Sequence, residues 1–208
     1  MSKISLQMYT VREHTKTFED LKKTFKRLSD IGFEMLQYSI PENFDAKEVK
    51  KLFDEYGMVN DSVYCQSLKV GEKMKSVIEE CELFNTKYVR VDSIPKGLTN
   101  FADGYKCYAH YLNELCTELK KHGIKLVYHF HAFEFKRFGE DTGIDILLKE
   151  TDPEGVQIIP DTHWIQSGGK NVVEFFTKYA DRFDYVHTKD FGIGPQGATW
   201  EARPIEFA

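Results

Sequence analysis

Hydrophobic residues along the chain follow two alternating patterns. Short runs of β-branched and aromatic residues are typical of buried strands, and the segments between them carry apolar residues every three or four positions, as one face of a helix does. The segment from Phe18 to Ile31 has the helical spacing and is followed by Gly32, which favours the left-handed conformation that ends a helix. The patterns predict strands at 4–9, 33–38, 58–65, 87–91, 124–130, 156–160 and 183–188. They predict helices around 18–31, 49–56, 70–84, 105–119, 144–149 and 172–179.

This alternation of strand and helix predicts a parallel sheet with right-handed crossovers. No GxGxxG motif follows the first strand, which favours a barrel over a dinucleotide-binding sheet. We therefore expect an α/β fold of the (β/α)8 TIM-type barrel class, with about seven βα units present and the eighth missing. A barrel of this class typically has about 250 residues. We interpret residues 1–208 as one TIM-barrel domain that is truncated at its C-terminus, and the glycine-rich tail at 192–208 as a loop.

The amino-acid composition excludes several classes of protein. Hydrophobic residues make up 41% of the chain and charged residues 29%, which is ordinary for a globular protein, and no apolar run is long enough to span a membrane. The N-terminus lacks the pattern of a secretory signal. The four cysteines form no CxxC pair, so we expect reduced thiols and a cytoplasmic location. The net charge of −5, with no basic half, argues against nucleic acid as a partner and favours a small-molecule ligand.

Residues with metal-binding or catalytic side chains gather at the predicted carboxyl ends of three consecutive strands, where barrel enzymes hold their active sites. These residues are His129, His131, Asp161, His163 and His187. His129 and His131 are two positions apart and therefore lie on the same face of their strand. Imidazoles and a carboxylate from neighbouring strands suit Mn, Co, Zn or Fe better than Ca or Mg. The sequence thus predicts a divalent transition-metal site.

Each of these residues also has a structural interpretation. A histidine at a strand end often only hydrogen-bonds a carbonyl of the barrel rim. Asp161 lies where it could cap the helix that follows. Lys189 and Asp190 could form a surface ion pair. The sequence alone leaves these alternatives open.

Several stretches resemble the sugar phosphate isomerase/epimerase group of the xylose-isomerase-like TIM barrels. They occur in the expected order along the whole chain, which makes the set more specific than any one of them. The matching stretches are LQMYTVR (6–12), KLVYHFHAFEF (125–135), TGID (142–145), TDP (151–153), PDTHW (160–164) and YVHTKDF (185–191).

The resemblance implies a divalent metal at the barrel mouth and proton transfer next to a ketose carbonyl. Asp161 and His187 match two ligand positions of the group. His129 stands where the epimerases have an acid, and a shifted alignment would make His131 or Glu134 the ligand instead. The group's glutamate from the eighth strand has no counterpart before the chain ends, so we expect the natural chain to be some tens of residues longer.

We therefore predict a metal-dependent isomerase or epimerase that acts on a sugar, a sugar phosphate or a polyol. Glu134 or His131 would move the proton, and His163, Trp164 and Lys189 would bind the carbohydrate. A lyase similar to inosose dehydratase is the alternative, because the same enolate can expel a hydroxyl group. A non-catalytic sugar-binding barrel is an alternative of another class. We expect no nucleic-acid or membrane partner, and the sequence leaves a homo-oligomer open.

Overall fold

The computed structural model describes residues 4–189, apart from the side chain of Ser67. The chain divides into two compact units, each of which is described by itself. Unit 1 comprises the residues up to Arg90 together with His122–Ile124, and unit 2 comprises Val91–Lys121 and the residues from Lys125 onward. The assignment of 1–208 to one domain stays a prediction. The predicted loop at 192–208 lies outside the described residues.

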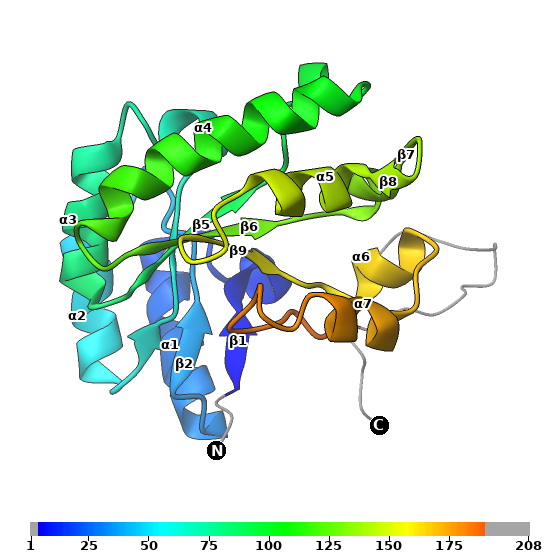
Figure 1. Ribbon diagram of the computed structural model, residues 1–208. Coiled ribbons are helices and arrows are strands. Elements are labelled where there is room, and N and C mark those ends of the chain that lie inside the picture. Colours follow the sequence, from blue (N-terminus) through cyan, green and yellow to red (C-terminus); the bar gives the residue numbers. More distant parts are fainter. Residues whose placement is uncertain (1–3, 190–208) are drawn as a thin grey trace. The chain divides into compact units, whose positions relative to one another are not determined.

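Unit 1 contains parallel strands connected by helices (Figure 1). β1 (Ser5–Gln7) pairs with β2 (Met35–Gln37), and β2 pairs with β3 (Val59–Asn60). β4 (Val63–Tyr64) pairs with the start of β5 (Tyr88–Asp92). All these pairs are parallel, as the predicted crossovers require. The connecting elements are η1 (Met8–His14), α1 (Phe18–Ile31), α2 (Ala46–Glu55), η2 (Ser67–Lys69) and α3 (Met74–Phe84).

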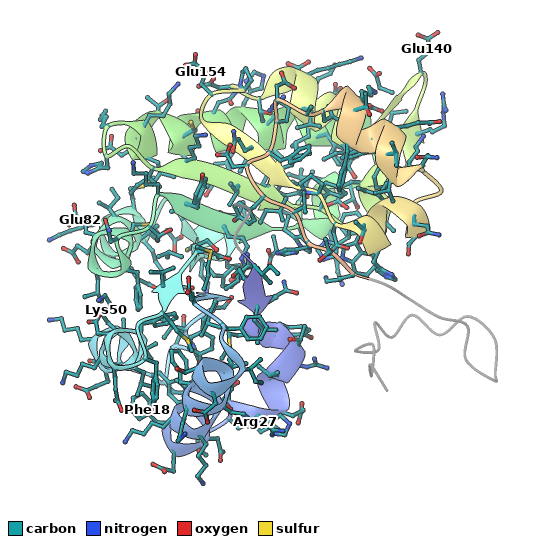
Figure 2. All side chains as sticks on the ribbon, turned by 90° about the horizontal axis from the view of Figure 1, so that it is seen from below. Phe18, Arg27, Lys50, Glu82, Glu140 and Glu154 are labelled. Carbon is teal, nitrogen blue, oxygen red and sulfur yellow. The ribbon has the colours of Figure 1, made fainter. Side chains whose placement is uncertain are left out.

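The helices of unit 1 bury one face each and leave the other in water. Phe25 on α1 meets Phe53 on α2 edge to face, with 4.9 Å between the ring centroids. Phe53 in turn meets Phe84 on α3 at 5.5 Å. Figure 2 shows Arg27 of α1 and Lys50 of α2 extending away from the ribbon. The amphipathic pattern in the sequence therefore corresponds to a real core that holds these strands in place.

In unit 2, β6 (Lys125–His129) pairs in parallel with β9 (Val156–Ile159), and the register sets His129 opposite Ile159. The antiparallel strands β7 (Arg137–Phe138) and β8 (Asp141–Thr142) form a hairpin. α4 packs against α5 (Figure 1). The α-helices and 3-10 helices are η3 (Lys96–Leu98), α4 (Ala102–Lys120), η4 (Ala132–Phe135), α5 (Gly143–Glu150), α6 (Thr162–Ser167) and α7 (Val172–Lys178).

Helix α4 has 19 residues but is amphipathic. Within residues 4–189, no helix is both long enough and apolar enough to cross a bilayer.

Several predicted elements differ from the observed ones. The strand expected at 4–9 ends at Gln7, and Met8 and Tyr9 belong to η1. The strand expected at 58–65 is two short strands, of which the first pairs with β2 and the second with β5. The third helix begins at Met74 instead of at residue 70. The strand expected at 183–188 is present as a single parallel bridge at His187.

The hairpin of β7 and β8 was not predicted. Its strands have two residues each, too few for a period of two to appear in the sequence. Its turn contains Gly139 in the left-handed conformation (φ 73°) and places Glu140 at an exposed tip (Figure 2). In the sequence, Gly139 is the residue that indicates a turn at this point.

Candidate metal centre

Three side chains from neighbouring strand ends converge in unit 2. His129 is the last residue of β6, and Asp161 follows β9 after one proline. The backbone N–H of His187 donates to the carbonyl of Pro160 at 2.8 Å, and His187 forms a parallel bridge with Asp161. One ligand atom each from His129, Asp161 and His187 lies within 4.8 Å of the others, and all three residues are buried. The parallel register therefore brings the three predicted ligands together.

The two oxygens of Asp161 have different partners. Oδ1 accepts from the backbone N–H groups of His163 at 3.0 Å and Trp164 at 3.2 Å, and so caps α6. Oδ2 lies 3.2 Å from His129 Nε2, 2.7 Å from Lys189 Nζ and 3.7 Å from His187 Nδ1. Asp161 is thus both a helix cap and a member of the cluster, so the two interpretations of the sequence are compatible.

Lys189 forms an ion pair with Asp161 of the cluster. Asp190, with which a surface ion pair was considered from the sequence, lies outside the described residues. The backbone of Lys189 is held by Thr162. Its N–H donates to Thr162 Oγ1 at 2.8 Å, and the Thr162 hydroxyl donates to its carbonyl at 2.7 Å. Since Thr162 is the first residue of α6, directly after Asp161, the main chain fixes the lysine next to the carboxylate.

Burial and hydrogen bonding set the charge of the cluster. Burial lowers the pKa of His129 to about 4, although its hydrogen bond to Asp161 acts the other way. Burial would raise the pKa of Asp161, but hydrogen bonds from His129 and His187 and the charge of Lys189 outweigh it and hold the pKa well below its ordinary value. At neutral pH the cluster therefore presents a carboxylate beside a neutral imidazole at His129. These are the protonation states that metal ligands require.

The donor set fits a divalent transition metal. It consists of two imidazoles and one carboxylate, and such mixed nitrogen and oxygen donors suit Zn, Co, Fe or Mn, whereas Ca and Mg prefer oxygen alone. The buried carboxylate is already paired with the ammonium group of Lys189, since an isolated charge of this kind is costly inside a protein. His129, Asp161 and His187 are therefore the residues that would hold the ion.

His131 lies beside the cluster and is only partly buried. Its ring centroid is 4.9 Å from that of His129, 5.0 Å from Trp164 and 5.8 Å from Phe133, on which it stacks. Its Nδ1 lies 3.1 Å from the hydroxyl oxygen of Ser93. Burial lowers the pKa of His131, so the imidazole is neutral at neutral pH and can accept a proton.

Glu134 lies close in sequence but is engaged elsewhere. Its side chain is fully buried, Oε1 accepts from the Tyr128 hydroxyl at 2.5 Å, and Oε2 accepts from the backbone N–H of His131 at 2.9 Å. Burial raises the pKa of Glu134 to about 7. The contacts of Glu134 thus join it to the turn that carries His131 and do not place it in the metal cluster.

Two of the predicted substrate-binding residues lie on α6. His163 is buried, with Nε2 3.5 Å from the hydroxyl oxygen of Ser167, and its ring lies 4.6 Å from that of Trp164. Trp164 also contacts His131, so α6 is adjacent to the cluster. Lys189 reaches the cluster through Asp161.

Two further residues near the cluster, Asp92 and Ser93 at the carboxyl end of β5, were not among the site residues predicted from the sequence. Asp92 Oδ1 lies 3.9 Å from His129 Nδ1, the nitrogen that does not face Asp161. Ser93 contacts His131 as described above. The position of Asp92 at a strand end was a signal for it. Ser93 gave none, because its contact depends on a backbone conformation that serine rarely adopts.

Similarity to known proteins agrees with this picture. The chain matches the family model of the xylose isomerase-like TIM barrel over residues 25–206. It is 43% identical over 91 residues to an inosose dehydratase from Geobacillus kaustophilus, a stretch that covers 44% of this chain and 27% of that enzyme. The match thus spans well under half of the relative's own length.

Two crystal structures show the same fold. A sugar phosphate isomerase/epimerase from Parabacteroides distasonis superposes with a TM-score of 0.81 at 22% identity, covering 97% of this chain and 83% of the other. The IolI protein, crystallised with a zinc atom, superposes with a TM-score of 0.71 at 12% identity, covering 93% and 75%. These superpositions confirm the predicted TIM-barrel class. Since the family model also matches most of the sequence, the chain belongs to the xylose isomerase-like TIM barrel family.

Proposed function

We propose that this protein is a metal-dependent enzyme that removes a proton next to the carbonyl of a polyhydroxylated ketone, and that the reaction ends in loss of water. The observation that carries the proposal is the convergence of His129, Asp161 and His187, whose ligand atoms lie within 4.8 Å of one another. When bound there, a divalent metal supplies Lewis acidity toward a carbonyl oxygen, which makes the neighbouring C–H more acidic.

His131 is the proton acceptor in this proposal. It is partly exposed, it is neutral at neutral pH, and it adjoins the cluster. Glu134, the other candidate, uses both carboxylate oxygens for hydrogen bonds inside the turn, so we assign it the role of holding the backbone of His131. Proton transfer by a positioned imidazole typically contributes about 10²- to 10⁴-fold to a rate.

The substrate contacts are assigned to the residues around His131. Trp164 adjoins it directly and offers an apolar ring face to the carbon–hydrogen side of a polyol. His163 supports Trp164 from the same helix. The ammonium group of Lys189, next to Asp161, is available to an oxygen of the substrate that becomes negative during the reaction.

Dehydration is favoured over isomerisation by the 43% identity to an inosose dehydratase, although that match covers 44% of this chain. After His131 has removed the proton, the hydroxyl group on the next carbon takes up that proton from His131 and departs as water, which leaves His131 neutral again. Epimerisation or isomerisation is the second candidate, supported by the structural likeness to a sugar phosphate isomerase/epimerase. In that case the proton returns and no water is lost.

One experiment separates these outcomes. The purified protein, supplied with Mn, Co, Zn or Fe, is incubated with an inosose and with open-chain ketoses in D2O, and the products are followed by NMR and mass spectrometry. We expect the inosose to lose water. Deuterium incorporation without loss of water would favour the isomerase or epimerase. Binding with neither change would favour the sugar-binding barrel and contradict the proposal.

A further inference from the structure

Unit 1 contains a cavity that the candidate metal centre does not explain. The cavity has a volume of about 470 Å³ and is lined by residues of η1 and α1. None of His129, Asp161 and His187 is among these lining residues. Small-molecule sites in proteins typically have volumes of about 300–1,000 Å³. The cavity is therefore large enough for a ligand of its own.

Helix α1 and η1 are joined at the wall of the cavity. The hydroxyl of Thr24 on α1 donates to the carbonyl of His14, the last residue of η1, at 2.6 Å. Both residues line the cavity, and Thr24 is buried. The two elements are thus held together without a ligand. A site formed in advance loses less free energy when it binds, because less has to be ordered.

The basic residues of α1 fall into two groups. Lys22 and Lys26 form ion pairs with acids of the same helix, at 3.9 Å and 2.8 Å. Lys23 and Arg27 line the cavity, and neither forms an ion pair within residues 4–189. The side chain of Arg27 extends away from the ribbon (Figure 2). Residues four apart on a helix are neighbours, and like charges at this spacing repel each other. The helix therefore presents two uncompensated positive charges to the cavity.

Two acids also line the cavity, but each is already engaged. Glu13 forms an ion pair with Lys16. Asp20 accepts a hydrogen bond from the hydroxyl of Thr17 at 2.7 Å, and it lies in the first turn of α1, where the helix dipole stabilises a negative charge. The two cations of the cavity are thus left for a negatively charged ligand.

The rest of the lining is apolar. It consists of Val11, Leu28 and Ile31. Ile31 is 65% exposed, although it is a large hydrophobic residue. It follows Arg27 by about one helical turn, so an apolar surface lies beside the charges on the same helix. Covering this surface would be favourable, because it removes apolar area from water.

We propose that this cavity binds a small organic anion. Its carboxylate or phosphate group pairs with Lys23 and Arg27, and its hydrocarbon part covers Ile31 and the neighbouring apolar side chains. A guanidinium group matches such oxyanions because it can donate two parallel hydrogen bonds. The proposal goes beyond the proposed function, since the cavity shares no residue with the candidate metal centre.

NMR titration of the full 208-residue chain labelled with ¹⁵N tests this site. Hexanoate and hexyl phosphate each carry an oxyanion and a hydrocarbon chain, and comparing them separates a carboxylate ligand from a phosphate ester. Inorganic phosphate and 1-hexanol carry one of these parts each. We expect saturable shifts of backbone amides within residues 11–31 with hexanoate or hexyl phosphate. Phosphate alone and hexanol alone should bind at least about tenfold more weakly.

A pair of double variants locates the binding. Lys23→Gln with Arg27→Gln should weaken binding by about tenfold or more, because two charged partners are lost. Lys22→Gln with Lys26→Gln is the matched control, since it removes the same charge from the same helix outside the cavity lining. It should change the dissociation constant by less than about twofold, because exposed charges outside the site are screened by salt.

Thermal melting verifies that both double variants fold, as expected for changes at exposed positions. Three results would overturn the assignment. The first is the absence of saturable shifts within residues 11–31 with both hexanoate and hexyl phosphate. The second is equal weakening in the two double variants. The third is inorganic phosphate or hexanol binding as tightly as the better of the two hydrocarbon anions.

Discussion

At the scale of single residues, Asp161 connects the fold to the chemistry. One of its oxygens caps α6 and the other faces two histidines and a lysine. The carboxylate is fully buried, so its orientation is fixed and both sets of contacts exist at once. Substitutions that keep the cap and remove the charge should separate the two roles.

Asp161→Asn keeps an oxygen that can cap α6, because asparagine caps helices as well as aspartate does. We expect metal affinity to fall by about 100-fold or more, since even residues behind the ligands contribute about 10- to 100-fold. Asp161→Ala should lose the cap as well and be less stable than the Asn variant by about 1 kcal/mol. Metal titration and urea unfolding measure these effects. Equal metal affinity in the Asn variant and the unmodified protein would contradict the ligand role.

Lys189 competes with a metal ion for the same oxygen, because its ammonium group lies 2.7 Å from Asp161 Oδ2. Lys189→Met should therefore bind a divalent metal about tenfold more tightly, which corresponds to about 1.4 kcal/mol. Competition with a fluorescent chelator gives the affinity. Lys125→Met is the control, since Lys125 forms a similar ion pair with Asp184 at 2.7 Å away from the cluster. Unchanged or weaker binding in Lys189→Met would show that the lysine does not compete.

Glu134 should make stability depend on pH. Burial raises its pKa from 4.5 to about 7 in the folded state, so between these values the folded protein holds a proton that the unfolded chain has released. Its contribution to folding is therefore lost as pH rises from about 4.5 to 7, by about 3 kcal/mol in total. Glu134→Gln removes this dependence.

Urea unfolding at pH 5 and pH 8 tests the Glu134 prediction. The stability of Glu134→Gln relative to the unmodified protein should increase by about 2.5 kcal/mol between the two pH values. A difference that is the same at both pH values would mean that Glu134 titrates normally in the folded protein.

The residues at strand ends could be predicted from the sequence, whereas most of their hydrogen-bond partners could not. His129, Asp161 and His187 could be predicted to meet, because parallel strands end at the same edge of a sheet. That Glu134 is tied to Tyr128 could not be predicted, since a side chain in an irregular turn chooses its partners by packing. The contact between Ser93 and His131 could not be predicted either, because it involves a residue with a positive φ angle, which no residue pattern indicates.

At the scale of elements, α5 fits closely against α4. Gly143 is the first residue of α5, and a Cβ added there would lie 2.3 Å from Cζ of the Tyr105 ring. Tyr105 is fully buried, so the ring has little room to move. Helix α5 therefore needs glycine at this position because a larger residue would clash with the ring of Tyr105. The φ angle of Gly143 is not one that favours glycine.

Gly143→Ala should destabilise the protein by about 1–3 kcal/mol through overpacking. Gly97→Ala is the control, because a Cβ at Gly97 meets no atom within 4 Å. Both variants are compared by urea unfolding. An unchanged midpoint for Gly143→Ala would show that α5 can shift away from α4 at little cost.

Helices were easier to predict than strands. The helical period extends over several turns, as in α1, whereas β3 and β4 have only two residues each. β3 pairs with β2 and β4 pairs with β5, and a run of apolar residues does not reveal this change of partner.

At the scale of the whole molecule, the alternation of strands and helices was enough to predict the barrel class that the family match confirms. The order of the elements determines the fold class, whereas the reaction depends on a few side chains at strand ends. The cluster of His129, Asp161 and His187 supports a metal-dependent enzyme.

The central claim is that His129, Asp161 and His187 hold one divalent metal ion. The most direct measurement is metal content after chelator treatment, reloading with Zn or Mn and dialysis, in the unmodified protein and in His187→Ala. We predict close to one bound ion per chain in the unmodified protein and almost none in a folded His187→Ala variant. Equal metal content in the two proteins, or none in the unmodified one, would contradict the account.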